Sequence, residues 1–360
     1  MLRHCRQPLS LLVLLMTLVV GCRREETAPV AQPATQPSIT IGYAAPGWGG
    51  AQYFIMDGLR RRAESRGWKV LVVNSNLEAD IQQRQIDYLI DHHVKAIVCV
   101  PVHSQKIATS MARAQAMGIP FYTIDRAPGE GRADMIVQAD NFMAGEQAGE
   151  AMVRCIRQRN GAVAGTILVL QGELTQTVAQ QRDDGFNRAV APYPGLRILR
   201  RETHWLPNLF AEETEKVLQK TELDGIYLQS DTAGLSEVLP VLKRLGKLHP
   251  VGEAGHIVIV GVDGGQIALQ AIREHFVDCA VSQPLTDFGI VADWIERRFR
   301  AQSPMPGRVE EHDALWGPAE LIDGPHGMQL LLRTTPVTGD NVDDPRLWAN
   351  QLHQAARRSR

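Results

Sequence analysis

Residues 96–126 read AIVCVPVHSQKIATSMARAQAMGIPFYTIDR, and they contain one complete unit of the fold. Ala96–Val100 is a short apolar run of the kind that forms a strand buried on both faces. Ser104–Met117 then places apolar residues three or four positions apart, which predicts a helix with one buried stripe. After Gly118-Ile119-Pro120, a second apolar run leads to Asp125-Arg126. The stretch therefore predicts a strand–helix–strand unit with parallel strands.

The same alternation of apolar runs and helical segments continues on both sides of this unit. Such units have right-handed crossovers and place helices on both faces of a parallel sheet, so the sequence predicts an α/β fold. The other expected strands are Ile39–Ala44, Val70–Val73, Thr166–Leu170, Gly225–Leu228 and Ile257–Val260. The other expected helices are Tyr53–Arg66, Ala79–His92, Gln180–Val190 and Phe210–Lys220.

Polar and aromatic side chains follow these strands where the apolar runs end. Ligands of open parallel sheets bind beyond the carboxyl ends of the strands, so we expect these residues to lie close together. Carboxylates accept hydrogen bonds from hydroxyl groups, arginine donates in a fixed fork, and aromatic rings cover apolar C–H faces. The set therefore favours a neutral polyol as ligand. It comprises Trp48, Gln52, Tyr53, His103, Asp125, Arg126, Gln180, Ser230, Asp231, Asp263 and Gln283.

The N-terminal segment has the pattern of a bacterial lipoprotein export signal. Arg3 and Arg6 precede the apolar stretch Leu9–Val20, and Gly21-Cys22 follows it. An apolar stretch of about twelve residues is typical of a signal peptide and too short for a spanning helix. Because the pattern resembles the lipobox, we expect residues 1–22 to form the signal. A lipid on Cys22 would then anchor the protein to a membrane, at the periplasmic or extracellular face of the cell envelope.

Residues 23–37 are rich in proline and contain no apolar run, which predicts a tether. About 320 residues remain beyond it, a length that suits two domains of roughly 150 residues each. The formal net charge is −2 with both signs interspersed, so we expect no nucleic-acid partner. Cys99, Cys155 and Cys279 lie in strand-like or helical segments, which predicts three buried free thiols rather than disulfides.

Several motifs resemble the type I periplasmic sugar-binding proteins of the ribose-binding group. The resemblance covers roughly residues 38–347. The motifs are Gly118-Ile119-Pro120, Thr123-Ile124-Asp125-Arg126, Gln171-Gly172, Arg182–Phe186, Gln229-Ser230-Asp231, Ile259–Gly264, Val281-Ser282-Gln283 and Val337–Val342. They imply two Rossmann-like lobes, each with a doubly wound parallel sheet, joined by a hinge that the chain crosses three times.

The resemblance also implies lobe boundaries and a mode of action. Lobe one would comprise residues 38–139 and 284–327, and lobe two would comprise residues 140–283 and 328–345. Residues 346–360 would form a polar C-terminal tail. The ligand would bind in the cleft between the lobes and stabilise their closed arrangement.

Single residues receive roles from the same resemblance. Asp125, Arg126 and Asp263 fall on positions that bind sugar hydroxyls, Gln283 on a glutamine near the later hinge, and Trp205 on an aromatic ligand position. Other ligand positions differ from the ribose pattern. A second-domain arginine falls on Gln180, an asparagine on Ser230, and Trp48 stands in place of one phenylalanine ring. We therefore expect a monosaccharide or polyol other than ribose, with no cofactor and no metal.

Enzymes and DNA-binding regulators are the alternatives to a solute-binding protein. A Rossmann dehydrogenase would explain the parallel sheet, but the G-x-G-x-x-G pattern after the first strand fails at Gln52. The sequence contains no G-x-S-x-G, H-E-x-x-H or C-x-x-C motif, so it does not support a secreted hydrolase. A DNA-binding regulator would need a helix-turn-helix before the core. We expect a monomer that delivers a sugar to an ABC-type permease, or presents it to a membrane sensor kinase or chemoreceptor.

Overall fold

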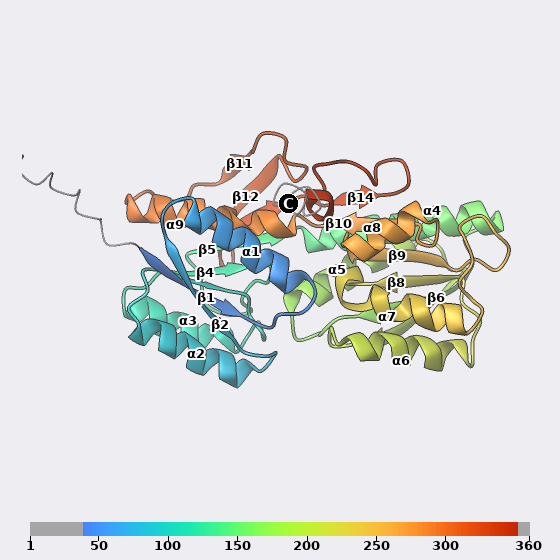
Figure 1. The fold of residues 1–360 in the computed structure, drawn as a ribbon, viewed down its shortest axis with the longest axis horizontal. Helices are drawn as coiled ribbons and strands as arrows, with labels where there is room; N and C mark the ends of the chain where they lie inside the picture. The colour runs from blue at the N-terminus through green and yellow to red at the C-terminus, as the bar shows by residue number, and fades with distance from the viewer. Residues whose placement is uncertain (1–38, 352–360) are drawn as a thin grey trace, which may run out of the picture. The chain divides into compact units, whose positions relative to one another are not determined.

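Two β-sheets organise residues 39–351, which are the residues that the computed structural model describes (Figure 1). The predicted signal peptide 1–22 with Cys22, the predicted tether 23–37 and the final residues 352–360 lie outside this range. Within it, no helix combines the length and the apolar character that a membrane span needs.

The first sheet has eight strands in the order β2-β1-β3-β4-β5-β13-β12-β11. Its strands are parallel except for β12, which is antiparallel to both of its neighbours. The strands are β1 Thr40–Ala45, β2 Lys69–Asn74, β3 Ile97–Cys99, β4 Phe121–Ile124, β5 Met135–Ala139, β11 Gly307–Val309, β12 Ala319–Gly324 and β13 Gly327–Leu332. Its helices are α1 Ala51–Glu64, α2 Ala79–Asp91, α3 Ile107–Ala116, the 3-10 helix η1 Leu285–Ile290 and α9 Val291–Phe299.

The second sheet has six strands in the order β7-β6-β8-β9-β10-β14, of which only β14 is antiparallel to its neighbour. The strands are β6 Gly165–Gln171, β7 Leu196–Glu202, β8 Gly225–Leu228, β9 Val258–Asp263, β10 Cys279–Ser282 and β14 Thr335–Val337. The helices are α4 Asn141–Asn160, α5 Thr177–Val190, α6 Pro207–Leu218, α7 Asp231–Arg244 and α8 Gln266–Arg273. We call the first sheet with its helices lobe one, and the second lobe two.

Helices cover both faces of each sheet. In lobe one, α1, η1 and α9 share a buried apolar cluster with one face, while α2 and α3 pack against the other face. In lobe two, α6, α7 and α8 cover one face, and α4 and α5 cover the other. Because both faces are buried, the central strands have apolar side chains on both sides, as Ile41 and Ala44 on opposite faces of β1 illustrate. The α/β fold with two doubly wound sheets is confirmed.

The chain passes between the two sheets three times. It leaves the first sheet after β5 at Asp140, whose side chain accepts a hydrogen bond from Met143 N and so caps α4. It returns after β10 through Gln283-Pro284. It crosses again between β13 and β14, at Arg333-Thr334.

The predicted boundary after residue 327 is wrong. β13, Gly327–Leu332, pairs in parallel with β5 and belongs to lobe one, because its apolar side chains complete that sheet.

The predicted polar tail is also wrong in its first part. Leu347, Trp348 and Ala349 are almost fully buried in the core, although polar residues surround them in the sequence. Trp348 stacks at a tilt on Phe54 of α1, with ring centroids 4.7 Å apart.

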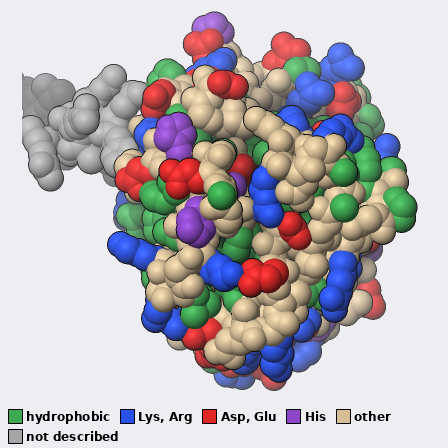
Figure 2. Space-filling model, turned by 90° about the vertical axis from the view of Figure 1, so that its right-hand side faces the viewer, with side chains coloured by type: hydrophobic (Ala, Val, Ile, Leu, Met, Phe, Trp, Pro, Cys, Tyr) green, Lys and Arg blue, Asp and Glu red, His purple; other side chains and the backbone are tan. Residues whose placement is uncertain are grey.

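The prediction of three buried free thiols needs one correction, because Cys155 on α4 is only half-buried, while Cys99 and Cys279 are buried. Over the face shown in Figure 2, acidic and basic side chains are interspersed.

Candidate ligand-binding site

A cavity of about 330 Å³ lies at the carboxyl ends of the strands of both sheets. Both sheets share the strand order 2-1-3-4-5 across their parallel part, and this order places a crevice where the connections change direction. Lobe one contributes the loops after β1, β2 and β4, and lobe two contributes α5 and the loops after β7, β8, β9 and β10. The cavity is therefore lined by both lobes.

Asp125 and Arg126 form the charged wall of the cavity on lobe one, and both are about 5% exposed. Asp125 Oδ2 accepts a hydrogen bond from Gln52 Nε2 at 3.0 Å and lies 3.5 Å from Arg126 Nε. Arg126 Nη1 donates to Pro101 O at 3.1 Å. Burial lowers the pKa of the Arg126 guanidinium from its usual value. These contacts fix both side chains before any ligand is present.

Asp263 is the corresponding carboxylate on lobe two, and it is 2% exposed. Its Oδ1 accepts from Gln283 Nε2, and its Oδ2 accepts from the hydroxyl groups of Ser230 and Thr232. Burial raises the pKa of the Asp263 carboxyl, while the nearby Arg182 guanidinium acts in the opposite direction. Four neighbours therefore hold this carboxylate in one orientation.

Arg182 approaches Asp263 from α5, with Nη1 3.5 Å from Asp263 Oδ1. Its Nε donates to Asn141 Oδ1 at 3.1 Å, and Nη1 also donates to the carbonyl oxygen of Gln229. Its position depends on close packing of α4 and α5, because a Cβ at Gly145 would come within 2.1 Å of Arg182 O.

Two tryptophan rings border the cavity, one from each lobe. Trp48 belongs to the loop after β1 and is 49% exposed. Trp205 belongs to the loop after β7, and the Arg182 guanidinium lies 5.8 Å from its ring centroid. The Trp205 ring also lies against Gly172, where a Cβ would meet it at 1.9 Å. The rings can cover apolar faces of a ligand while the buried polar groups bind its hydroxyls.

Strained backbone accompanies these residues. Asp125, Trp205 and Asp263 have φ angles of 66°, 61° and 113°, which non-glycine residues rarely adopt. Such strain persists only where the surrounding structure enforces it, and it is concentrated at functional sites.

Three of the residues that line the cavity also have unused hydrogen-bonding capacity. Gln52 Oε1, Arg126 Nε and Gln283 Oε1 are buried and make no hydrogen bond within the protein. Buried polar atoms without partners are rare, because each costs free energy. The charged residues lining the cavity are two aspartates and two arginines, so their formal charges cancel. This arrangement suits an uncharged ligand that carries several hydroxyl groups.

A family model described as periplasmic binding protein domain matches residues 41–294. The chain belongs to the periplasmic binding protein family. This membership supports the prediction of a solute-binding protein rather than an enzyme.

Curated relatives of this periplasmic binding protein include sugar- and polyol-binding proteins. The chain is 28% identical to the xylitol-binding protein of Mycolicibacterium smegmatis over 222 residues, which are 60% of this chain and 59% of that protein. It is 24% identical to the ribose import binding protein RbsB of Bacillus subtilis over 278 residues, which are 76% of this chain and 86% of that protein.

A solved structure shares the fold. An ABC transporter solute-binding protein from Mycobacterium smegmatis with bound glycerol superimposes with a TM-score of 0.72 at 23% identity. The superposition covers 85% of this chain and 96% of that one.

The structure brings eight of the twelve predicted ligand residues together around the cavity: Trp48, Gln52, Asp125, Arg126, Trp205, Ser230, Asp263 and Gln283. The other four lie outside its lining. Tyr53 follows Gln52 on α1, so it faces another side of the helix and is half exposed. His103 is half-buried, and its Nδ1 accepts from Gln105 N at 3.3 Å.

Gln180 and Asp231 are displaced from the cavity for different reasons. Gln180 is exposed on α5 and donates to Leu174 O at 2.7 Å. Asp231 is buried behind the cavity, where its carboxylate accepts from Gly264 N and Gly265 N, both at 2.9 Å. Burial, followed by repulsion from Asp263, raises the Asp231 pKa. Asp231 therefore supports the turn that carries Asp263.

Sequence reasoning missed other cavity residues. Arg182 begins the motif Arg182–Phe186, but the sequence analysis assigned it no role in ligand binding. Asn76 and Leu77 follow β2, and Val178 and Thr232 sit in the first turns of α5 and α7. The rule that ligand residues follow strand ends could have identified Asn76 and Leu77. Nothing in the sequence distinguished the apolar Val178 from a core residue.

Proposed function

We propose that this protein captures an uncharged monosaccharide or polyol between its lobes and delivers it to an ABC-type permease. The observation that carries this proposal is that two aspartates and two arginines line the cavity together with the amide side chains of Gln52 and Gln283. The names of the xylitol-binding and ribose import relatives point to the same class of ligand.

Calorimetry with a panel of xylitol, D-ribose, D-xylose, myo-inositol and D-galactose tests the proposal. We expect at least one saturable ligand, and mass spectrometry should recover it unchanged, as binding without catalysis requires. Asp125→Ala and Asp263→Ala should each weaken binding by about a hundredfold, because hydrogen bonds to charged groups contribute ~1.5–3 kcal/mol each. A change below about threefold for both variants would place the site elsewhere.

The proposed mechanism is closure of the lobes around the ligand. The three connections between the sheets permit a hinge, and a ligand that contacts both lobes stabilises their closed arrangement. Small-angle scattering should show a smaller radius of gyration at saturation. An unchanged radius with confirmed binding would instead indicate a rigid pocket.

We also propose that the protein is held at a membrane by a lipid on Cys22. The support is the sequence pattern around Gly21-Cys22 after the apolar stretch. Wild type should enter the detergent phase on partitioning, and Cys22→Ala should remain in the aqueous phase. Cys155→Ala is the matched control, since that thiol lies on α4 within the fold. Equal partitioning of wild type and Cys22→Ala would exclude the anchor.

A further inference from the structure

Gln176 connects an aromatic wall of the cavity to the opposite lobe. The side chain is 2% exposed, and both of its polar atoms have partners. Its Oε1 accepts from Trp205 Nε1 at 2.7 Å, and its Nε2 donates to Val102 O at 2.9 Å. Trp205 belongs to lobe two, whereas Val102 follows β3 in lobe one. A single buried amide therefore links a cavity-lining ring to the lobe across the cleft.

A second bond between the lobes lies next to the first. Gln176 is the N-cap residue of α5, and the backbone N–H of Thr177 donates to Ser104 Oγ at 3.4 Å. The first N–H groups of a helix have no partner within the helix, so Ser104 of lobe one supplies one from outside. Ser104 is itself 3% exposed. Both bonds must break when the lobes separate.

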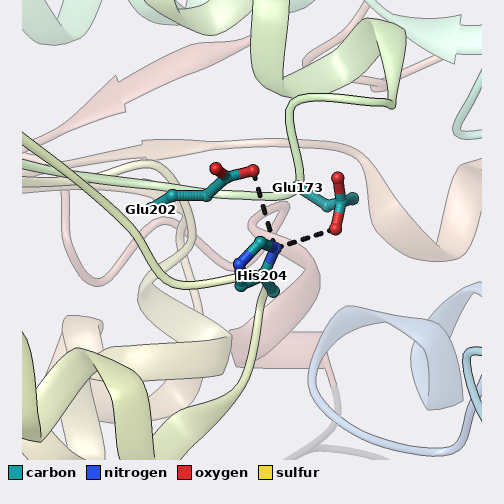
Figure 3. Close-up of side chains that lie close together, drawn as sticks. All are labelled: Glu173, Glu202 and His204. Atoms are coloured by element: carbon teal, nitrogen blue, oxygen red, sulfur yellow. Dashed lines mark hydrogen bonds and ion pairs between the residues drawn. The ribbon is translucent and has the colours of Figure 1, made fainter.

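A cluster of three side chains fixes the two loops that carry Gln176 and Trp205 (Figure 3). His204 lies between Glu173 and Glu202, with its Nδ1 2.8 Å from Glu173 Oε2 and 3.5 Å from Glu202 Oε1. Glu202 Oε1 also accepts from Leu174 N at 3.1 Å. The cluster therefore joins the loop between β6 and α5 to the loop between β7 and α6, so that Gln176 and Trp205 hold their relative positions.

Charges of both signs line the cavity from both lobes. Arg126 and Arg182 line it from opposite lobes, as do Asp125 and Asp263. Closure without a ligand therefore brings both like and opposite charges closer, so these four charges do not by themselves decide between the open and closed arrangements. The pKa of Arg126 is lowered chiefly by burial, and Arg182 adds to this effect. Contacts between the lobes outside the cavity therefore contribute to the balance between the two arrangements.

We propose that Gln176 is a positioning residue that orients Trp205 and latches lobe two to lobe one, thereby setting the balance between the open and closed arrangements. Its effect on ligand release rests on the proposed function, but its effect on the lobes does not. The latch slows ligand dissociation, because the ligand leaves only after the bond to Val102 O breaks. Without the latch, association should rise only by the factor by which the open arrangement becomes more populated, since the ligand enters that arrangement.

The test compares Gln176→Glu with the parent in the Cys22→Ala form of the full chain. Glutamate can still accept from Trp205 Nε1, but an ionised carboxylate cannot donate to Val102 O. Without ligand, the variant should have a larger radius of gyration in small-angle scattering. With whichever of xylitol and D-ribose the parent binds, dissociation should be about tenfold faster and association should change less than about twofold.

Matched variants separate the latch from a general loss of structure. Gln219→Glu makes the same chemical change at an exposed position of lobe two and should behave as the parent. Gln176→Met removes both hydrogen bonds without adding charge, so it tests the latch even if Gln176→Glu fails to fold. Ser104→Ala should speed dissociation by a smaller factor.

Two measurements keep failure of the latch distinct from failure of the proposed function. If the parent binds neither probe, the ligand-free scattering comparison still tests the latch. If Gln176→Met folds and matches the parent in ligand-free radius of gyration, the latch proposal is overturned. Equal dissociation rates for a bound probe would overturn it as well.

Discussion

Arg182 and Gln180 illustrate at the scale of single residues why the site could be predicted only in part. Asp125, Arg126 and Asp263 directly follow or end strands, so strand ends in the sequence locate them. Arg182 lies on a helix instead. Two residues along a helix correspond to a rotation of about 200° around its axis, so the two side chains lie on nearly opposite sides. Arg182 therefore lines the cavity while Gln180 is exposed. The resemblance alone did not fix the rotational register of α5.

Arg182→Ala should weaken ligand binding by at least about tenfold, because it removes a charged donor and leaves Asp263 without its buried ion pair. Gln180→Ala should change affinity by less than about threefold. Calorimetry with the ligand identified from the panel measures both. A larger effect at Gln180 than at Arg182 would contradict the observed register of α5.

Asp287 of η1 carries a second prediction at this scale. Burial raises the pKa of its carboxyl to about 6, against the opposing effect of Arg62. A carboxyl whose folded-state pKa exceeds its unfolded value contributes stability at low pH, and that contribution is lost as the pH rises through about 6. Asp287→Asn should therefore be more stable than wild type at pH 8, by on the order of 2 kcal/mol, and equally stable near pH 4.

Thermal or urea unfolding between pH 4 and 8 measures this difference. Asp91→Asn, which changes an exposed carboxyl at the end of α2, is the control and should follow the wild-type profile. Parallel profiles for Asp287→Asn and wild type would show that Asp287 ionises normally in the folded protein.

At the scale of elements, continuous apolar runs predicted most of the parallel strands, including the edge strand β2, whereas the buried strand β5 was not predicted. The structure places β8 at the expected residues, and β6 extends the expected run by one residue at each end. β7, Leu196–Glu202, was missed because it is an edge strand with three arginines and little apolar periodicity. β13 was assigned to the wrong lobe because a short apolar strand fits either sheet, and only its pairing with β5 decides between them.

The close approach of α4 and α5 predicts that Gly145→Ala destabilises the protein. In an ordinary helix this substitution would stabilise by roughly 0.5–1 kcal/mol. Here the added Cβ would lie 2.1 Å from Arg182 O, so the helices must separate, at a cost of about 1–3 kcal/mol. Unfolding in denaturant gives the stability change, and calorimetry should also show weaker ligand binding because Arg182 moves.

Glu150→Ala, on the exposed side of α4, is the control and should leave both stability and binding nearly unchanged. A stabilising effect of Gly145→Ala would show that the two helices are packed less closely than the structure indicates.

At the scale of the whole molecule, the C-terminal segment connects the two lobes near the cavity. Trp348 stacks on Phe54 of lobe one, and its Nε1 donates to Asp263 O of lobe two at 2.9 Å. Arg273 of α8 donates to Asn350 Oδ1 at 3.0 Å and holds the same segment to lobe two. The composition of residues 346–360 is polar, so sequence reasoning classed all of it as a tail, whereas three adjacent apolar residues suffice to dock it.

Deletion of residues 346–360 should therefore destabilise the protein and weaken ligand binding, whereas deletion of residues 352–360 should leave the Trp348 contacts in place. Removing a buried tryptophan side chain costs about 3–5 kcal/mol, so the melting temperature should fall by several degrees in the longer deletion. Trp348→Phe separates packing from hydrogen bonding, because it keeps a ring against Phe54 but cannot donate to Asp263 O. It should melt close to wild type yet bind ligand several-fold more weakly, since the strained backbone at Asp263 loses a partner. Equal melting temperatures for the longer deletion and wild type would show that the segment is dispensable, as a loose tail would be.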